Sequence, residues 1–118
     1  MSGICGMCGG RAGSPEATLD LMLSRLSVHS REKAAESACG SARLGVSARW
    51  ATQEIGELDG IYVAADTDLV NSSAIRKSLK DKNPSADFSS TPKCIAWLYR
   101  LHGLDFVRRL EGAFAIAI

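Results

Sequence analysis

AFAIAI, residues 113–118, is the most apolar stretch of this 118-residue chain. A short run of apolar residues without a charge predicts a buried β-strand. An apolar strand at the border of a sheet would present unpaired backbone groups and promote association. We therefore expect a further stretch of chain, a second subunit or another polypeptide to cover this segment.

Helix signals divide the rest of the chain. Ser14 and Pro15 predict an N-cap and first turn, followed by a stripe of leucines and Met22 that repeats with helical spacing. Asn71 is predicted to cap a second helix that ends before Asn83. Thr91 and Pro92 predict the start of a third helix, which ends at Gly103. A short helix is expected over 104–110.

Four segments are predicted as strands: 2–9, 42–50, 60–65 and 113–118. The alanine-rich segment 30–40 is predicted as a loop or short helix, and the segment around 53–57 as a connecting loop. The resulting order of strands and helices predicts an α+β layered fold in a single domain, 1–118.

The composition excludes several classes of protein. With 46% hydrophobic and 23% charged residues the chain has the balance of a globular protein, and its net charge of +1 gives no reason to expect nucleic acid or a membrane as partner. No segment has the length of a membrane span or the form of a signal peptide, so we expect a cytoplasmic protein.

The opening MSGICGMCGG contains a CxxC pair, Cys5 and Cys8. Structural zinc sites use four ligands, and no second pair accompanies this one. In a strand the two side chains would also point to opposite faces. We therefore expect no metal and no cofactor.

Ser2 offers a different chemistry. Removal of the initiator Met would leave Ser2 at the terminus, where the α-amine can act as the base for its own hydroxyl. Such a nucleophile requires a rigid strand and a nearby oxyanion hole, and the opening segment supplies the strand. An ordinary exposed terminal serine is the plainer alternative.

Nearly the whole chain resembles the N-terminal class II glutamine amidotransferase domain of the asparagine synthetase family. MSGICGMCG is similar to the family's opening Met-Cys-Gly-Ile, with Ser2 in place of the cysteine. ARLGVSARW and IYVAADTDLVN resemble two of its strands. LHGLDFVRRLEGAFAIAI resembles its Leu-x-Gly-x-Phe-Ala-Phe-Ala strand, which is the most specific match. The resemblance implies an Ntn hydrolase-like fold of layered antiparallel sheets with helices, incomplete relative to the family domain. It also leads us to expect the first and last strands as sheet neighbours.

The residues that the family uses for catalysis differ in this chain. The resemblance places the substrate-binding arginine near Ser47 or Ala48, with Arg49 one position out of register. It places the oxyanion-hole pair at Asp66 and Thr67, where a carboxylate would repel an oxyanion. The aspartate for the substrate amine falls near Thr91. The family's His-Arg-Gly-Pro-Asp loop becomes HSREK, residues 29–33.

We therefore expect a degenerate amidotransferase-like domain without glutaminase activity and with a structural or partner-binding role. Its partner would be a second copy or a synthetase-type subunit. An amidohydrolase that uses Ser2 after removal of Met1 is the alternative. A further one is a shifted match to the family's opening, in which removal of the first four residues leaves Cys5 at the N-terminus. A small α+β domain related by ancestry alone also remains open.

Overall fold

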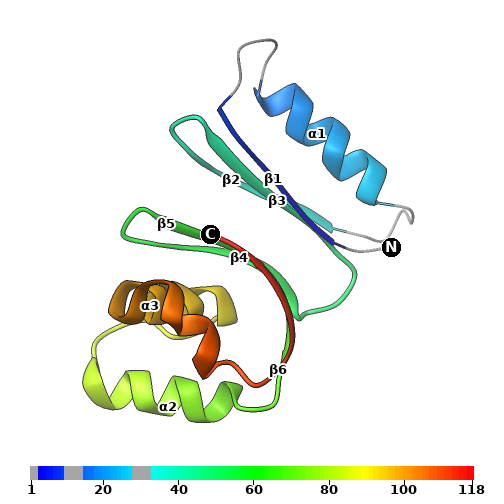
Figure 1. Cartoon of the computed structure of the whole chain (residues 1–118). Helices are drawn as coiled ribbons and strands as arrows, with labels where there is room; N and C mark the ends of the chain where they lie inside the picture. The colour runs from blue at the N-terminus through cyan, green and yellow to red at the C-terminus, as the bar shows by residue number, and fades with distance from the viewer. Residues whose placement is uncertain (1–2, 10–14, 28–32) are drawn as a thin grey trace.

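Two three-stranded antiparallel sheets face each other, and helices cover their outer faces (Figure 1). The structure, a computed structural model, describes residues 3–9, 15–27 and 33–118. Its strands are β1 (Gly3–Cys8), β2 (Lys33–Cys39), β3 (Ala42–Ala48), β4 (Gln53–Leu58), β5 (Ile61–Leu69) and β6 (Gly112–Ala117). Its helices are α1 (Pro15–Leu26), α2 (Ser72–Lys82), α3 (Thr91–His102) and the 3₁₀ helix η1 (Gly103–Arg109).

Each sheet is built from one continuous part of the chain. The first sheet has the order β1-β3-β2 and uses residues 3–48, whereas the second has the order β4-β5-β6 and uses residues 53–117. β1 contacts β5 and β6 across the interface, and β3 contacts β4 and β5. The chain therefore forms four layers, which are α1, the first sheet, the second sheet and the pair α2 and α3 (Figure 1).

Helix α1 packs on the first sheet through its leucine stripe, as the sequence predicts. Leu19 and Leu23 are buried, and a Cβ atom on Gly45 would lie only 3.0 Å from a methyl carbon of Leu23. The absence of a side chain at Gly45 thus allows the helix to approach the sheet closely. Val46, the neighbour of Gly45, is buried on the opposite face toward the second sheet.

The largest hydrophobic cluster lies between the second sheet and its helices. Its buried members are Val63, Ala65, Leu79, Phe88, Cys94, Ile95, Ala96, Leu98, Phe106 and Leu110. Val63 and Ala65, which alternate along β5, point toward the buried residues of α3. The side chains of the strand and of the helix therefore meet in one hydrophobic layer. Tyr99 and Phe106 add an edge-on ring contact with centroids 6.0 Å apart.

The predicted α+β class with antiparallel sheets is confirmed, and each predicted helix has a counterpart. Two predictions for loop segments are wrong, because β2 and β4 are strands. Both strands belong to hairpins with two-residue connections. Asp59 and Gly60 have φ angles of 47° and 82°, the left-handed conformation that a tight hairpin turn requires. The Asp59-Gly60 pair is a sequence signal for a tight hairpin turn, and it would have predicted β4 as the strand before that turn.

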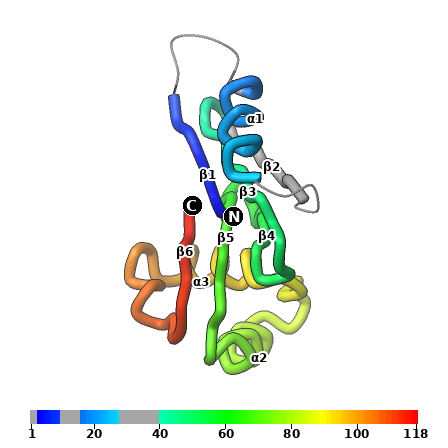
Figure 2. The backbone as a smooth tube through the Cα atoms, turned by 90° about the vertical axis from the view of Figure 1, so that its right-hand side faces the viewer, coloured from blue at the N-terminus to red at the C-terminus, as the bar shows by residue number. Residues whose placement is uncertain are grey.

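The prediction that the last strand is buried is also wrong. From Gly112 to Ala115 the residues of β6 are exposed, and only Ile116 and Ala117 are partly buried. β6 lies at the edge of the second sheet and pairs with β5, whereas β1 pairs with β3 in the first sheet. The first and last strands are therefore not sheet neighbours, and they meet only across the interface (Figure 2). Apolar composition alone does not distinguish an edge strand from a central one.

Asn71 occupies the position before α2, but its side chain makes no capping bond. Its amide nitrogen donates to the carbonyl oxygen of Arg109 at 2.8 Å, and its amide oxygen accepts from the N–H of Glu111 at 3.1 Å. Asn71 thus ties the start of α2 to the connection between η1 and β6. The predicted capping role is wrong, because these long-range partners use both ends of the amide.

Candidate functional site

The predicted site residues Arg49 and Asp66 lie at the end of the two sheets where β3 passes into β4, and Gln53 connects them. The Gln53 side chain is only 5% exposed. Its Oε1 accepts from the backbone N–H groups of Arg49 and Trp50 at 2.7 and 3.0 Å. Its Nε2 donates to Oδ2 of Asp66 at 2.9 Å. Gln53 therefore holds the turn after β3 and a carboxylate of β5 in one arrangement.

Arg49 contributes its backbone to this arrangement rather than its guanidinium. The guanidinium carbon lies 5.2 Å from the centre of the Trp50 ring, within the range of a cation–π contact. Both residues are exposed. The side chain that the sequence suggested for binding a substrate carboxylate is thus turned toward an exposed indole.

Asp66 and Thr67 are neighbours in β5, so their side chains lie on opposite faces of the second sheet. Asp66 pairs with Gln53 in β4 and shares its face toward the first sheet. Thr67 lies on the face of Val63 and Ala65, beside the helices, and is 5% exposed. The two predicted residues therefore cannot act on the same atom through their side chains.

A polar pocket of about 250 Å³ lies between the second sheet and the N-terminal ends of α2 and α3. It brings Thr67 together with Thr91, which is 24 positions away in sequence. Charged side chains of both signs, Glu54 and Arg76 among them, also line it. Two of the positions that the family resemblance singles out thus meet in one pocket, although Arg49 and Asp66 do not line it.

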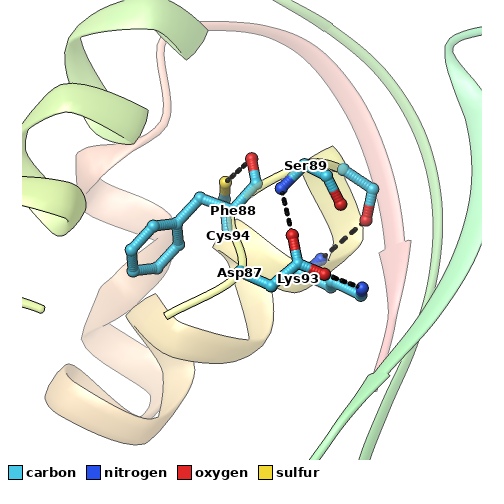
Figure 3. Close-up of polar contacts among 6 residues, drawn as sticks. Asp87, Phe88, Ser89, Lys93 and Cys94 are labelled. Atoms are coloured by element: carbon cyan, nitrogen blue, oxygen red, sulfur yellow. Dashed lines mark hydrogen bonds and ion pairs between the residues drawn. The ribbon is translucent and has the colours of Figure 1, made fainter. Parts of the chain in front are cut away.

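Ser89 and Ser90, in the turn before α3, line part of the polar pocket. Figure 3 shows the polar contacts of this turn. Oδ1 of Asp87 accepts from the N–H of Ser89 at 2.8 Å, and the ammonium of Lys93 forms an ion pair with the other oxygen. These contacts hold the pKa of Asp87 below its usual range, Lys93 being the main cause. Ser90 caps α3 by accepting from the N–H of Lys93.

Ser2, the predicted nucleophile, lies outside the described residues, as do residues 29–32 of the HSREK segment. The adjoining Gly3 pairs with Ser47 at the end of β3. The hydroxyl groups of Ser47 and Ser27 share a hydrogen bond of 2.8 Å. Ser47 is completely buried, so one of the two positions where the resemblance places a substrate-binding arginine holds a buried hydroxyl group.

The cysteines are separated in the way that strand alternation predicts. Cys5 lies against Gly45 beneath α1, and burial raises the pKa of its thiol. Cys8 is exposed and lines the space between the two sheets. Cys94 is buried, and desolvation raises the pKa of its thiol despite the nearby Arg76. Within residues 3–9, 15–27 and 33–118, no three His, Cys, Asp or Glu side chains gather in a way that could hold a metal ion.

A largely apolar cavity of about 600 Å³ opens between the sheets at the end opposite Gln53. Small residues such as Gly6, Ala42 and Ala117 line it, together with Tyr62 and Tyr99. The small side chains at Gly6, Ala42 and Ala117 do not fill the space between the two facing sheets, and this leaves the cavity open. None of the residues predicted for the site line this cavity.

Comparisons with protein-family models, with curated proteins and with solved structures found no match for this chain. Among the described residues, no helix combines the length and hydrophobicity needed to cross a membrane.

Gln53 is the residue of this site that the sequence reasoning missed. It stands in the segment predicted as a loop, where a glutamine gives no sign of burial. Its register partner Asp66 was singled out only through the family resemblance. The Asp59-Gly60 turn would have indicated that the two residues face each other across a hairpin.

Proposed function

We propose that this chain is a glutamine amidotransferase-like domain that lacks glutaminase activity and serves to bind a partner protein. The observation that carries the proposal is the hydrogen bond between Gln53 and Asp66. It holds a carboxylate at the position where the resemblance expects an oxyanion-hole amide. A negative charge there would destabilise a tetrahedral intermediate.

The layered sheets and the polar pocket are compatible with the resemblance, whereas the separation of β1 and β6 into different sheets departs from it. Facing antiparallel sheets with helices on both outer faces are compatible with the layered architecture that the resemblance implies. Thr67 and Thr91 meet in one pocket, as two substrate-binding positions should. Both are uncharged, so neither offers the carboxylate that would hold a substrate amine.

The sizes of the lost interactions favour the absence of glutaminase activity. Removal of one oxyanion-hole donor costs roughly 10²–10³ in rate. Arg49 also directs its guanidinium toward Trp50, and an unmade charged hydrogen bond costs about 1.5–3 kcal/mol. Together with a serine at the nucleophile position, these changes leave too little stabilisation for useful glutamine hydrolysis.

The test is release of ammonia from glutamine by the purified protein, compared with a Ser2→Ala variant. We expect both proteins to give the background rate of the buffer. Ammonia release that disappears in the variant would contradict the proposal. Ser2-dependent hydrolysis of another amide would instead support the amidohydrolase alternative, with intact-mass measurement showing whether Met1 has been removed.

A second arm tests the resemblance itself. Changing Ala48→Arg, Asp66→Asn, Thr67→Gly and Thr91→Asp together would restore four family positions, the substrate-binding arginine included. If the resemblance is correct, this variant should bind glutamine in a calorimetric titration while the unchanged protein does not. Equal absence of binding in a folded variant would count against the amidotransferase origin.

A further inference from the structure

We propose that the polar pocket beside the second sheet binds a small phosphate ester of a polyol. The pocket lies between β5 and the first turns of α2 and α3, and its volume is about 250 Å³. This inference rests on the proposed function, because it gives a ligand to a pocket that lacks the residues for glutamine hydrolysis. The two proposals can fail separately, since ammonia release and phosphate binding are measured in different experiments.

The N-terminal end of α2 is the first observation. Ser72, the first residue of this helix, lines the pocket. The side chain of Asn71 makes no capping bond, and within the described ranges the N–H groups of Ser72 and Ser73 have no acceptor. Free N–H groups at the start of a helix, together with the helix dipole, favour the binding of a phosphate. An anion in the pocket would give these donors the partner that the protein does not supply.

The hydroxyl group of Thr67 is the second observation, and it does not depend on the helix. Thr67 is 5% exposed, lies on the helix-covered face of β5 and lines the pocket. In the part of the chain that the structure describes, its hydroxyl has no hydrogen-bond partner. Buried polar groups are rarely left without a partner, so a molecule in the pocket is expected to supply one. A phosphate oxygen can accept from this hydroxyl.

Arg76 supplies a positive charge to the same pocket. It lies four residues after Ser72, on the same face of α2, and its guanidinium forms no ion pair with a carboxylate of the described residues. The donors of an arginine match the geometry of phosphate oxygens. Ser89 and Ser90, both in the turn of Figure 3, and Thr91 add hydroxyl groups from the side of α3.

Glu54 indicates the nature of the rest of the ligand. It pairs in register with Ala65, so its side chain lies on the helix-covered face of the sheet. It is half-buried, lines the pocket and has no hydrogen-bond partner among the residues described. A carboxylate repels a bare phosphate but accepts hydrogen bonds from hydroxyl groups. The pocket therefore fits a phosphate group at α2 that carries a hydroxylated carbon chain toward Glu54.

Asp68 also lines the pocket but does not add a second carboxylate to it. Asp68 follows Thr67 in β5, so the two side chains lie on opposite faces of the sheet. Asp68 thus contributes its backbone on the side of the helices. One carboxylate, one guanidinium and the free N–H groups of α2 remain as the charged and polar features of the pocket.

The test is a calorimetric titration of the full chain with glycerol phosphate, inorganic phosphate and glycerol at constant ionic strength. We expect glycerol phosphate to bind more tightly than inorganic phosphate, and glycerol not to bind. Arg76→Gln should weaken the binding of both phosphates roughly tenfold. Lys77→Gln removes the same charge at the next, exposed position of α2, outside the pocket, and should leave both affinities unchanged.

Two further variants separate the roles of the pocket residues. Thr67→Val keeps the shape of the side chain without its hydroxyl, and should weaken the binding of both phosphates about fivefold. Glu54→Gln removes the repulsion, so it should tighten the binding of inorganic phosphate roughly twofold. The same variant should lose most of the preference for glycerol phosphate. Circular dichroism checks that each variant is folded.

Nuclear magnetic resonance provides a measurement that does not depend on a variant. The N–H signals of residues 72–74 should shift when glycerol phosphate is added, whereas those of β3 should not. Absence of binding by both phosphates would overturn the proposal. So would equal weakening by Arg76→Gln and Lys77→Gln, or shifts confined to residues outside the pocket. Co-sedimentation with phosphatidylglycerol vesicles, without binding of free glycerol phosphate, would also overturn it, because the ligand would then be a lipid surface.

Discussion

At the scale of single residues, the side-chain amides of Gln53 and Asn71 each join parts of the chain that are distant in sequence. Each side chain uses both its donor and its acceptor, one between β3 and β5 and the other between α2 and the start of β6. The sequence shows that these residues are polar, but it does not show their partners. An amide can cap a helix or bond to distant backbone groups, and tertiary packing decides between the two.

Asp87 provides the residue-scale prediction for pH. Its ordinary pKa of 3.8 is lowered in the folded protein, mainly by the Lys93 ammonium and also by the Ser89 N–H. A carboxylate with a lowered pKa stabilises the fold above its unfolded pKa, and this stabilisation is lost as the pH falls through the folded value. Asp87→Asn should therefore lower the urea midpoint at neutral pH.

The difference between Asp87→Asn and the unchanged protein should shrink as the solution is acidified. It should also shrink at high salt, because the Asp87–Lys93 pair is exposed and screened. Asp20→Asn makes the same chemical change at an exposed position of α1 and serves as the control. A difference that stays constant from neutral to strongly acidic pH would show that the ion pair is not the cause.

At the scale of secondary-structure elements, the contact between α3 and β4 is unusually close. A Cβ atom on Gly56 would lie 2.9 Å from Cβ of Pro92, which is fully buried in the first turn of α3. Gly56→Ala should therefore push the helix from the sheet and destabilise the protein by about 1–3 kcal/mol. Urea unfolding followed by circular dichroism would measure this change.

Gly3→Ala is the matched control for Gly56→Ala. Among the described residues, a Cβ atom at Gly3 would meet only Leu26, at 3.5 Å, which is an ordinary contact. Replacement of a strand glycine where space allows is expected to be neutral or slightly stabilising. Similar losses of stability in both variants would mean that the glycines act through the backbone and not through the contact with Pro92.

Some secondary-structure elements could be predicted from local sequence signals and others could not. The boundaries of α1 and α3 follow from Pro15, Pro92, Gly103 and regular leucine spacing, all of which are local signals. β2 reads KAAESAC, a composition that gives little preference for a strand. It is a strand because β3 pairs with it along its whole length, which is a property of its neighbour. Such a strand is recognised through its hairpin turn rather than through its own residues.

At the scale of the whole molecule, burial is uneven among the elements whose side chains the structure describes. The second sheet and its helices contain the large hydrophobic cluster, whereas α1, β1 and β3 bury a smaller set around Leu19, Leu23 and Val46. Local unfolding requires less free energy where less apolar surface is buried. The first sheet should therefore open more readily than the second.

Native-state hydrogen exchange tests this expectation. Amides of β5 and α3 should exchange at the rate set by global unfolding, and those of β1 and β3 should exchange faster. Uniform protection across both sheets would show that the interface between them couples their unfolding fully. Slower exchange in the first sheet than in the second would contradict the argument from buried surface.

Residues 49–52 connect the two sheets. Every described strand pairing of the first sheet lies before this connection in sequence, and every described pairing of the second sheet lies after it. Cleavage within this connection would consequently break no described strand pairing. Two separately produced pieces, divided at the connection, would each retain their complete set of described strands. Their recombination on mixing would make the chain a natural starting point for a split reporter, in which joining of the halves signals that two fused proteins have met.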